Sequence, residues 1–299
     1  MLNLRGVIAP VVTTFGNRGD ALDLDAFATN LRAYAAAGLS GIVVCGSTGE
    51  AALLDEQERR SLIEQCRREM PSDMLLIVGT GAESTKQCVE RCRVANEHGA
   101  HAVLVVAPHY YSSAMTPAAL EAHYVRVADE SPLPVLLYNI PKYMHFALEP
   151  DLVARLSTHE NIVGMKDSAG DLTRLASYVQ SQRDQFTVLT GHGGTFSQAL
   201  ELGVRGGILA ISLFAAELTL DIYDTHKAGD RGASMESQKA ATPLAAEIVG
   251  RMGVAGVKAA MDRVGLAGGP VRSPLVPLSI EDEARVDALL RDARVTAAV

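Results

Sequence analysis

The chain has 299 residues, of which 48% are hydrophobic and 21% charged, and its formal net charge at pH 7 is −8. This composition is typical of a globular protein and excludes a disordered chain. The acidic balance, without any Lys/Arg-rich run, excludes nucleic acid or an anionic membrane surface as an expected partner. No apolar stretch reaches the roughly 18 residues that cross a bilayer, and the run at 6–12 is too short for a signal sequence, so we expect a cytoplasmic protein.

Along the first 224 residues, short apolar runs alternate with longer stretches of helical period. The short runs predict eight strands, at 7–13, 41–46, 75–81, 102–108, 135–141, 162–168, 187–193 and 206–212. The stretches between them predict helices, several with Ser, Thr or Asp caps, at 23–37, 55–70, 84–98, 117–129, 149–157, 171–182 and 195–202. The strand runs are almost continuously apolar, as in strands buried on both faces of a sheet. We therefore predict an α/β fold, a (β/α)8 TIM barrel, with a doubly wound open sheet as the alternative.

The remaining segment, 225–299, contains no strand-like run. Helical periodicity recurs at 234–250, 254–264 and 280–293, and a loop rich in glycine and proline, 268–274, separates the last two. We expect two domains, a catalytic barrel over 1–224 and a C-terminal helical region over 225–299 that packs on it.

Neither the cysteines nor the histidines follow a metal-binding pattern. The four cysteines are Cys45, Cys66, Cys88 and Cys92. We expect them to be reduced and to serve packing, with Cys88 and Cys92 on one helix face. Three histidines fall near the expected mouth of the barrel, His109, His145 and His192. Their spacing supports no ligand set, so we predict no metal site.

Lys166 stands alone in the apolar run of the strand expected at 162–168. Alternation places it on the face of Gly164, which leaves space beside it. A buried, unpaired charge is costly, whereas a neutral lysine amine is a nucleophile toward carbonyl carbon, so a Schiff base is the first hypothesis. The alternative is that the strand ends at Met165 and the lysine points into water.

Other polar residues also fall where the expected strands end, which is the active-site face of such a barrel. Ser47, Thr48 and Gly49 form a turn whose hydroxyl and N–H groups could cradle a carboxylate, although such residues suit any strand-to-helix turn. Tyr110 and Tyr138 are phenols at the ends of two other strands, and either could equally serve packing.

Four motifs together resemble the N-acetylneuraminate lyase and dihydrodipicolinate synthase superfamily of class I aldolases: GSTGE at 46–50, PHYY at 108–111, YNIP at 138–141 and GMKDSAGD at 164–171. The resemblance covers both the barrel and the C-terminal region. It implies that Lys166 forms an imine with pyruvate or another 2-oxo acid, without a separate cofactor. It further implies that Tyr138 transfers protons, that Ser47 and Tyr110 relay them, and that Ser47 with Thr48 binds the substrate carboxylate.

The same resemblance implies further residues at the substrate site, namely Gly49, Lys142, Tyr143, Gly191 and Ile208. The GHGG stretch beginning at Gly191 reads mainly as a close-packed loop, because no basic residue adjoins it. Tyr110 reaches a neighbouring subunit's site in the family, so we expect a homo-oligomer, either a dimer or a tetramer.

One position departs from the dihydrodipicolinate synthases. They carry an arginine five residues after the tyrosine that corresponds to Tyr138, where it binds the second substrate's carboxylate, whereas this chain has Tyr143. The adjacent Lys142 cannot reproduce the bidentate geometry of a guanidinium. The stretch 108–171 is most similar to the 4-hydroxy-2-oxoglutarate aldolases, which also lack this arginine.

We therefore expect a lyase that reversibly cleaves a 4-hydroxy-2-oxo acid to pyruvate and an aldehyde. The substrate would be 4-hydroxy-2-oxoglutarate or a 2-keto-3-deoxy sugar acid. The alternatives are a dihydrodipicolinate synthase that condenses pyruvate with aspartate semialdehyde, a dehydratase of the same superfamily, and a non-catalytic homologue that binds a 2-oxo acid.

Overall fold

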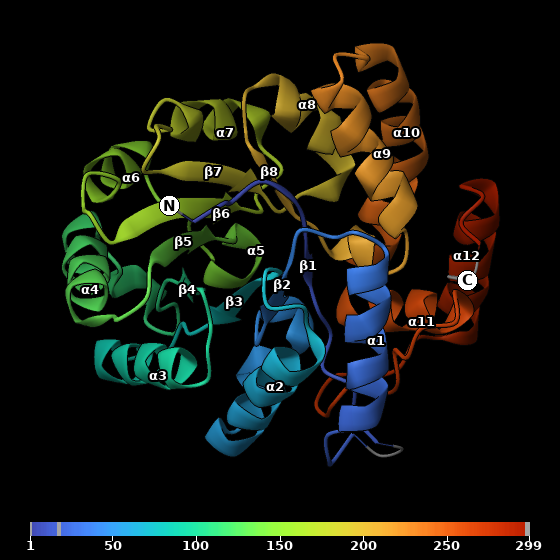
Figure 1. Cartoon of the computed structure of the whole chain (residues 1–299), viewed down its shortest axis with the longest axis horizontal. Coiled ribbons are helices and arrows are strands. Elements are labelled where there is room, and N and C mark those ends of the chain that lie inside the picture. Colours follow the sequence, from blue (N-terminus) through green and yellow to red (C-terminus); the bar gives the residue numbers. More distant parts are fainter. Residues whose placement is uncertain (1, 17–18, 297–299) are drawn as a thin grey trace.

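The computed structural model describes residues 2–16 and 19–296, and eight parallel strands form a closed barrel in the order β1 to β8 (Figure 1). The strands are β1 (Gly6–Pro10), β2 (Gly41–Val44), β3 (Leu75–Gly79), β4 (Ala102–Val106), β5 (Val135–Asn139), β6 (Ile162–Asp167), β7 (Thr187–Thr190) and β8 (Gly206–Ile208). The predicted barrel is confirmed, and the open sheet is wrong. Each strand ends earlier than predicted, because apolar residues beyond it, such as Val11 and Val12, are buried in the loops.

Helices alternate with the strands and cover the outside of the barrel (Figure 1). They are α1 (Leu24–Ala36), α2 (Glu56–Glu69), α3 (Thr85–Glu97), α4 (Pro117–Glu130), α5 (Pro141–Met144), α6 (Pro150–Leu156), α7 (Leu172–Val179), α8 (Phe196–Glu201) and α9 (Ala216–Lys227). Capping residues define where several helices begin. Asp55 forms a capping box with Glu58 at the start of α2, and the Asp171 carboxylate accepts two backbone N–H groups at the start of α7. Such caps satisfy the otherwise unpaired N–H groups of the first turn.

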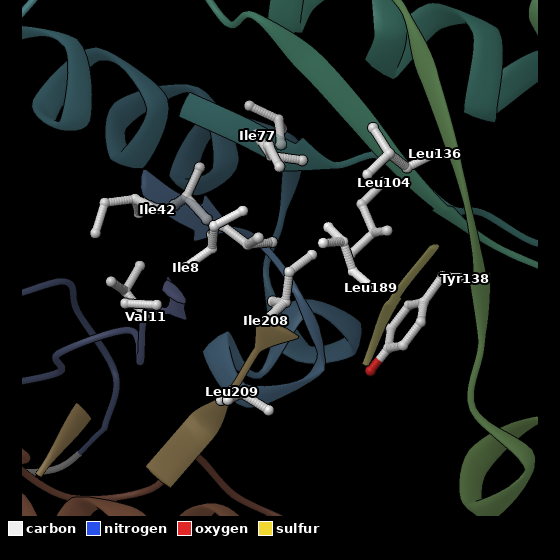
Figure 2. Close-up of a cluster of buried hydrophobic side chains, with 14 of the residues drawn as sticks. Ile8, Val11, Ile42, Ile77, Leu104, Leu136, Tyr138, Leu189, Ile208 and Leu209 are labelled. Carbon is white, nitrogen blue, oxygen red and sulfur yellow. The ribbon is translucent and has the colours of Figure 1, made fainter. Parts of the chain in front are cut away.

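Aliphatic side chains from seven strands fill the barrel interior (Figure 2). They are Ile8, Ile42, Ile77, Leu104, Leu136, Leu189 and Ile208, each at most 2% exposed. In β6 the partner of Leu136 is Gly164, where a Cβ would come within 2.5 Å of the Thr187 carbonyl oxygen. This glycine therefore lets β6 and β7 approach closely, which is a different reason from the space beside Lys166 that the sequence suggested. Tyr138 lies at the edge of the cluster.

The C-terminal region consists of α10 (Arg231–Pro243), the π-helix η6 (Leu244–Arg251), α11 (Gly253–Arg263) and α12 (Ile280–Asp292). Figure 1 shows these orange and red helices gathered near α1 and β8. They contact the loops at the carboxyl ends of three strands, through Gln238 with Gly193, Lys142 with Gly250, and Lys258 with Glu50. The region thus covers part of the face on which the site is expected.

The division proposed between residues 224 and 225 falls inside α9, which runs through to Lys227. A two-domain description therefore stays a proposal, and a boundary that respects the helices would follow Lys227. No helix in the described ranges is long and apolar enough to cross a membrane.

Candidate active site

Lys166 and Tyr138 are direct neighbours on adjacent strands, because β5 and β6 pair in that register. The Lys166 Nζ donates to the Tyr138 hydroxyl at 3.4 Å and lies 4.4 Å from the centre of its ring. The lysine is 5% exposed and the tyrosine 4%. The strand does not end at Met165 but continues to Asp167, so the interpretation of Lys166 as a solvent-facing lysine is wrong.

The Lys166 amine faces no carboxylate in the described part of the chain. Within residues 2–16 and 19–296, no carboxylate oxygen comes within 4.0 Å of it, although Asp167 follows directly in the chain. Asp167 points to the other face of β6, where it accepts from the Asn139 side-chain nitrogen at 2.7 Å, and burial raises the pKa of Asp167 to about 6. A buried amine with a phenol rather than a carboxylate beside it is suited to nucleophilic attack on a carbonyl carbon.

Gly191, at the carboxyl end of β7, packs directly against the Lys166 side chain. A Cβ on this residue would lie 2.6 Å from the Lys166 Cε and would overlap the Ser168 hydroxyl. Any larger residue would displace the amine from Tyr138. The geometry thus gives Gly191, which the family resemblance placed at the substrate site, a steric reason to be glycine.

The turn after β2 forms a short 3-10 helix, η1 (Ser47–Gly49). It rests on the loop after β1, where the Thr13 hydroxyl donates to the Gly49 carbonyl at 2.6 Å. The Gly49 N–H is also occupied, by the Gly46 carbonyl at 3.0 Å. Ser47 and Thr48 are half-buried, and within the described part of the chain their hydroxyls have no hydrogen-bond partner. Of the turn residues, these two are left free to bind an anion.

The short helix α5, which follows β5, carries Lys142 and Tyr143. Tyr143 is 40% exposed, and its pKa is raised by burial and then by the neighbouring Tyr138 phenol. Lys142 is turned away, because its Nζ donates to the Gly250 carbonyl of η6 at 2.8 Å. A phenol, not a cation, therefore occupies this side of the site.

Tyr110 is not brought to the other candidate residues. It is 77% exposed, and its ring lies edge-on to that of Tyr111 with 5.0 Å between the centroids. Among the described residues of one chain, no hydrogen bond joins it to Tyr138 or Ser47. A role for Tyr110 in the chemistry would need a second subunit.

Ile208 and His192 make no polar contact with Lys166 or Tyr138 in the described part of the chain. Ile208 is fully buried in the interior layer, where it can form only the floor of the site (Figure 2). His192, after β7, bonds to the Thr195 hydroxyl at 3.0 Å, and burial lowers its pKa. In the described ranges there is no group of three or more His, Cys, Asp or Glu residues able to hold a metal. All four cysteines are free and buried.

Sequence reasoning missed two polar groups that hold the site loops. Glu83 accepts the backbone N–H groups of His109 and Tyr110 at 3.0 and 2.9 Å, which fixes the loop after β4. Asn139 accepts the Leu148 N–H at 2.9 Å while donating to Asp167, which fixes the loop that carries Tyr143. Asn139 stands in the YNIP motif and could have been singled out, whereas Glu83 carries no sequence signal.

Comparison with known proteins agrees with this geometry. The sequence model of the dihydrodipicolinate synthetase family matches residues 3–293. A 4-hydroxy-tetrahydrodipicolinate synthase of Methanothrix thermoacetophila is 33% identical over 290 residues, or 96% of each chain. Another, from Xanthomonas axonopodis pv. citri, is 36% identical and matches 98% of this chain and 95% of its own length.

Among solved structures, the pyruvate complex of the dihydrodipicolinate synthase from Acinetobacter baumannii superposes with a TM-score of 0.93. It is 28% identical, and the match covers 98% of this chain and 100% of that one. These relatives bear the names of synthases, so the closer resemblance to 4-hydroxy-2-oxoglutarate aldolases is not confirmed, whereas the superfamily resemblance is.

Proposed function

The chain belongs to the dihydrodipicolinate synthetase family of pyruvate-dependent carbon–carbon lyases, and from that premise we propose that it is an aldolase for 4-hydroxy-2-oxo acids. The observation that carries the proposal is the buried Lys166 amine, which lies beside the Tyr138 phenol and has no counter-ion among residues 2–16 and 19–296. Tyr143, in place of a cation, favours an aldehyde partner that need not present a carboxylate at that position.

The proposed reaction begins when the Lys166 amine adds to C2 of the 2-oxo acid and water leaves. The protonated imine that forms withdraws electrons from C3. Tyr138 gives its phenolic proton to the hydroxyl that leaves as water, and its phenolate then removes the proton of the 4-hydroxyl while the C3–C4 bond breaks and the aldehyde departs. The electrons of the C3–C4 bond form an enamine, which takes this proton back from Tyr138 at C3. Water then adds to C2 of the imine and releases pyruvate and the free amine.

Ser47 and Thr48 are proposed to bind the substrate carboxylate through their unpartnered hydroxyls. Support comes from their position on η1 and from the matching need of a carboxylate for hydrogen-bond donors. Gly49 would hold the turn, Gly191 would leave space for the imine, and Ile208 would close the floor.

The test compares the rates of cleavage and of condensation in separate assays. A panel of 4-hydroxy-2-oxo acids is incubated with the protein and pyruvate release is followed with lactate dehydrogenase, while condensation of pyruvate with aspartate semialdehyde is followed separately. We expect a larger kcat/KM for cleavage of at least one acid. Faster condensation than any cleavage would overturn the proposal.

The second candidate is 4-hydroxy-tetrahydrodipicolinate synthase, which the names of the relatives from Methanothrix and Xanthomonas favour. The variant Tyr143→Arg separates the two functions. In an aldolase, a guanidinium at this position should improve a poor condensation with aspartate semialdehyde; in a synthase that already binds this substrate in another way, it should impair the condensation.

We also propose that the active form is at least a dimer in which Tyr110 completes a neighbour's site, since its ring is exposed in one chain. Mixing Lys166→Met subunits with Tyr110→Phe subunits tests this. A shared site predicts partial recovery of activity in the mixture, because some sites then combine Lys166 with an intact Tyr110. No recovery in a verified hetero-oligomer would contradict sharing.

A further inference from the structure

Glu50, the last residue of the GSTGE motif, takes no part in the proposed chemistry, yet its side chain is fully buried. Its backbone is in the left-handed region, with φ 55° and ψ 35°. A residue other than glycine keeps this conformation only where its surroundings hold it. Something must therefore fix Glu50 in place.

One half of the explanation lies on α11. The Lys258 Nζ is 2.6 Å from one carboxylate oxygen of Glu50, and the lysine side chain is 1% exposed. The same amine donates to the Pro270 carbonyl at 2.7 Å and lies 4.7 Å from the centre of the Phe15 ring. The lysine thus joins the turn after β2 to the C-terminal region.

The other half is Arg272, in the loop between α11 and α12. Its backbone N–H donates to the second Glu50 oxygen at 2.8 Å. Its guanidinium binds both Glu58 carboxylate oxygens, at 2.7 and 2.6 Å, and stacks over the Phe15 ring at 4.2 Å. Glu58 is itself part of the capping box at the start of α2, so Arg272 connects Glu50 to the first turn of that helix as well.

Backbone hydrogen bonds connect Glu50 to the turn residues that are proposed to bind the carboxylate. The Glu50 N–H donates to the Ser47 carbonyl at 3.2 Å, and the Ala51 N–H donates to the Gly46 carbonyl at 3.3 Å. The turn is therefore one hydrogen-bonded unit. Ser47 sits at its ligand-facing end and Glu50 at its anchored end.

We propose that Lys258 and Arg272 are positioning residues that hold Glu50, and through it the Ser47–Thr48 hydroxyls, in register with the substrate carboxylate. This inference rests on the proposed function, in which those hydroxyls bind the 2-oxo acid. It assigns the C-terminal helical region a part in substrate binding, although it supplies no group that touches the substrate.

The test compares pyruvate with methyl pyruvate, which keeps the reacting carbonyl but lacks the anionic carboxylate. Imine formation on Lys166 is measured by borohydride trapping over a range of concentrations, for the wild type and for Lys258→Met. We expect the half-saturating concentration of pyruvate to rise about 10- to 100-fold, since misplacement by about 1 Å can cost on the order of a hundredfold. For methyl pyruvate we expect a change of less than about threefold.

Lys239→Met is the matched control, because this exposed lysine on α10 pairs with Glu236 and its loss removes the same charge. It should leave both substrates unaffected. If Lys258→Met does not fold, Glu50→Gln replaces it, since it removes the charge that pairs with Lys258 and retains the side-chain volume. It should raise the half-saturating concentration of pyruvate more than that of methyl pyruvate.

Equal shifts for the two substrates, or no shift in a folded variant, would overturn the inference and leave the pair with a purely structural role. Failure of the proposed function looks different: the wild type itself would then trap no pyruvate, or would condense pyruvate with aspartate semialdehyde faster than it cleaves any 4-hydroxy-2-oxo acid.

Discussion

Two lysines of this chain look alike in the sequence and differ in the structure. Lys166 in β6 and Lys258 in α11 each stand alone in an apolar segment, and they are 5% and 1% exposed. Each amine also lies within 5 Å of the centre of an aromatic ring. Lys258, however, has a carboxylate partner in Glu50, whereas Lys166 has a phenol. Burial alone does not mark a catalytic lysine; the group that faces the amine does.

The electrostatics follow from these partners. Burial lowers the pKa of Lys258, and the Glu50 carboxylate opposes that effect. A paired ammonium is held in its charged form and is a poor nucleophile. Lys166 lacks such a partner, because the carboxylate next to it in the chain, Asp167, faces Asn139 instead.

The largest difference should appear when each lysine is replaced by methionine and turnover is measured. Lys166→Met should lose at least about a thousandfold in kcat, because no other amine can form the imine. Lys258→Met should keep kcat within about tenfold at a saturating concentration of the 4-hydroxy-2-oxo acid and should mainly raise KM. Equal loss of kcat in two folded variants would erase the proposed distinction.

Removing the partner of Lys166 is the next test. Tyr138→Phe deletes the hydroxyl but keeps the ring over the amine, so imine formation should persist while cleavage slows by about 10² to 10⁴-fold. Steady-state kinetics and borohydride trapping together measure the two steps. Unchanged cleavage would show that another group transfers the proton.

The loss of unfolding free energy should be larger for Lys258→Met than for Lys166→Met, the opposite of the order expected for kcat. Lys258→Met leaves the buried Glu50 carboxylate without its counter-ion, which should cost about 3 to 5 kcal/mol of unfolding free energy. In Lys166→Met, removal of a desolvated amine offsets the lost hydrogen bond to Tyr138, so the change should stay within about 1 kcal/mol. Urea unfolding measures both, and a larger loss in Lys166→Met would contradict this comparison.

The smallest effect concerns Asp167, whose pKa is raised by burial to about 6. The folded protein keeps a proton that the unfolded chain releases near pH 4, so this contribution to stability is complete below about pH 4 and is lost as pH rises toward 6. The resulting loss of unfolding free energy between pH 4 and pH 6 amounts to about 2 to 3 kcal/mol, and Asp167→Asn should abolish it.

The measurement is the difference in unfolding free energy between wild type and Asp167→Asn at several pH values, so that other titrating groups cancel. A difference that grows in the other direction would mean that Asp167 is held ionised and serves as the counter-ion of Lys166 after all.

Local patterns suffice to predict the barrel, because eight apolar runs separated by capped helices leave few other folds. Alternation along its strand singles out Lys166, whereas the role of Tyr138 beside it comes from the family resemblance, since by itself this phenol could equally serve packing. Several strand ends were overestimated because buried loop residues, such as Val11, Val12 and Ile140, continue the apolar run. The role of Gly164 was also misread, since its neighbour is the Thr187 backbone on another strand.

The anchoring of the turn after β2 could not be predicted in the same way. Glu50, Lys258 and Arg272 meet only because the C-terminal region folds back over the barrel face, and nothing in their local sequence specifies that contact. The contacts of Tyr110 could not be predicted for a related reason, because what its exposed ring contacts in an oligomer depends on a second chain.

The central claim is that Lys166, and not Lys258, captures the 2-oxo acid. The protein is incubated with pyruvate, reduced with borohydride and digested, and the modified lysine is identified by mass spectrometry. We predict one reduced pyruvate adduct, on the peptide that contains Lys166, and its absence in Lys166→Met. An adduct on Lys258, or none at saturating pyruvate, would contradict the account.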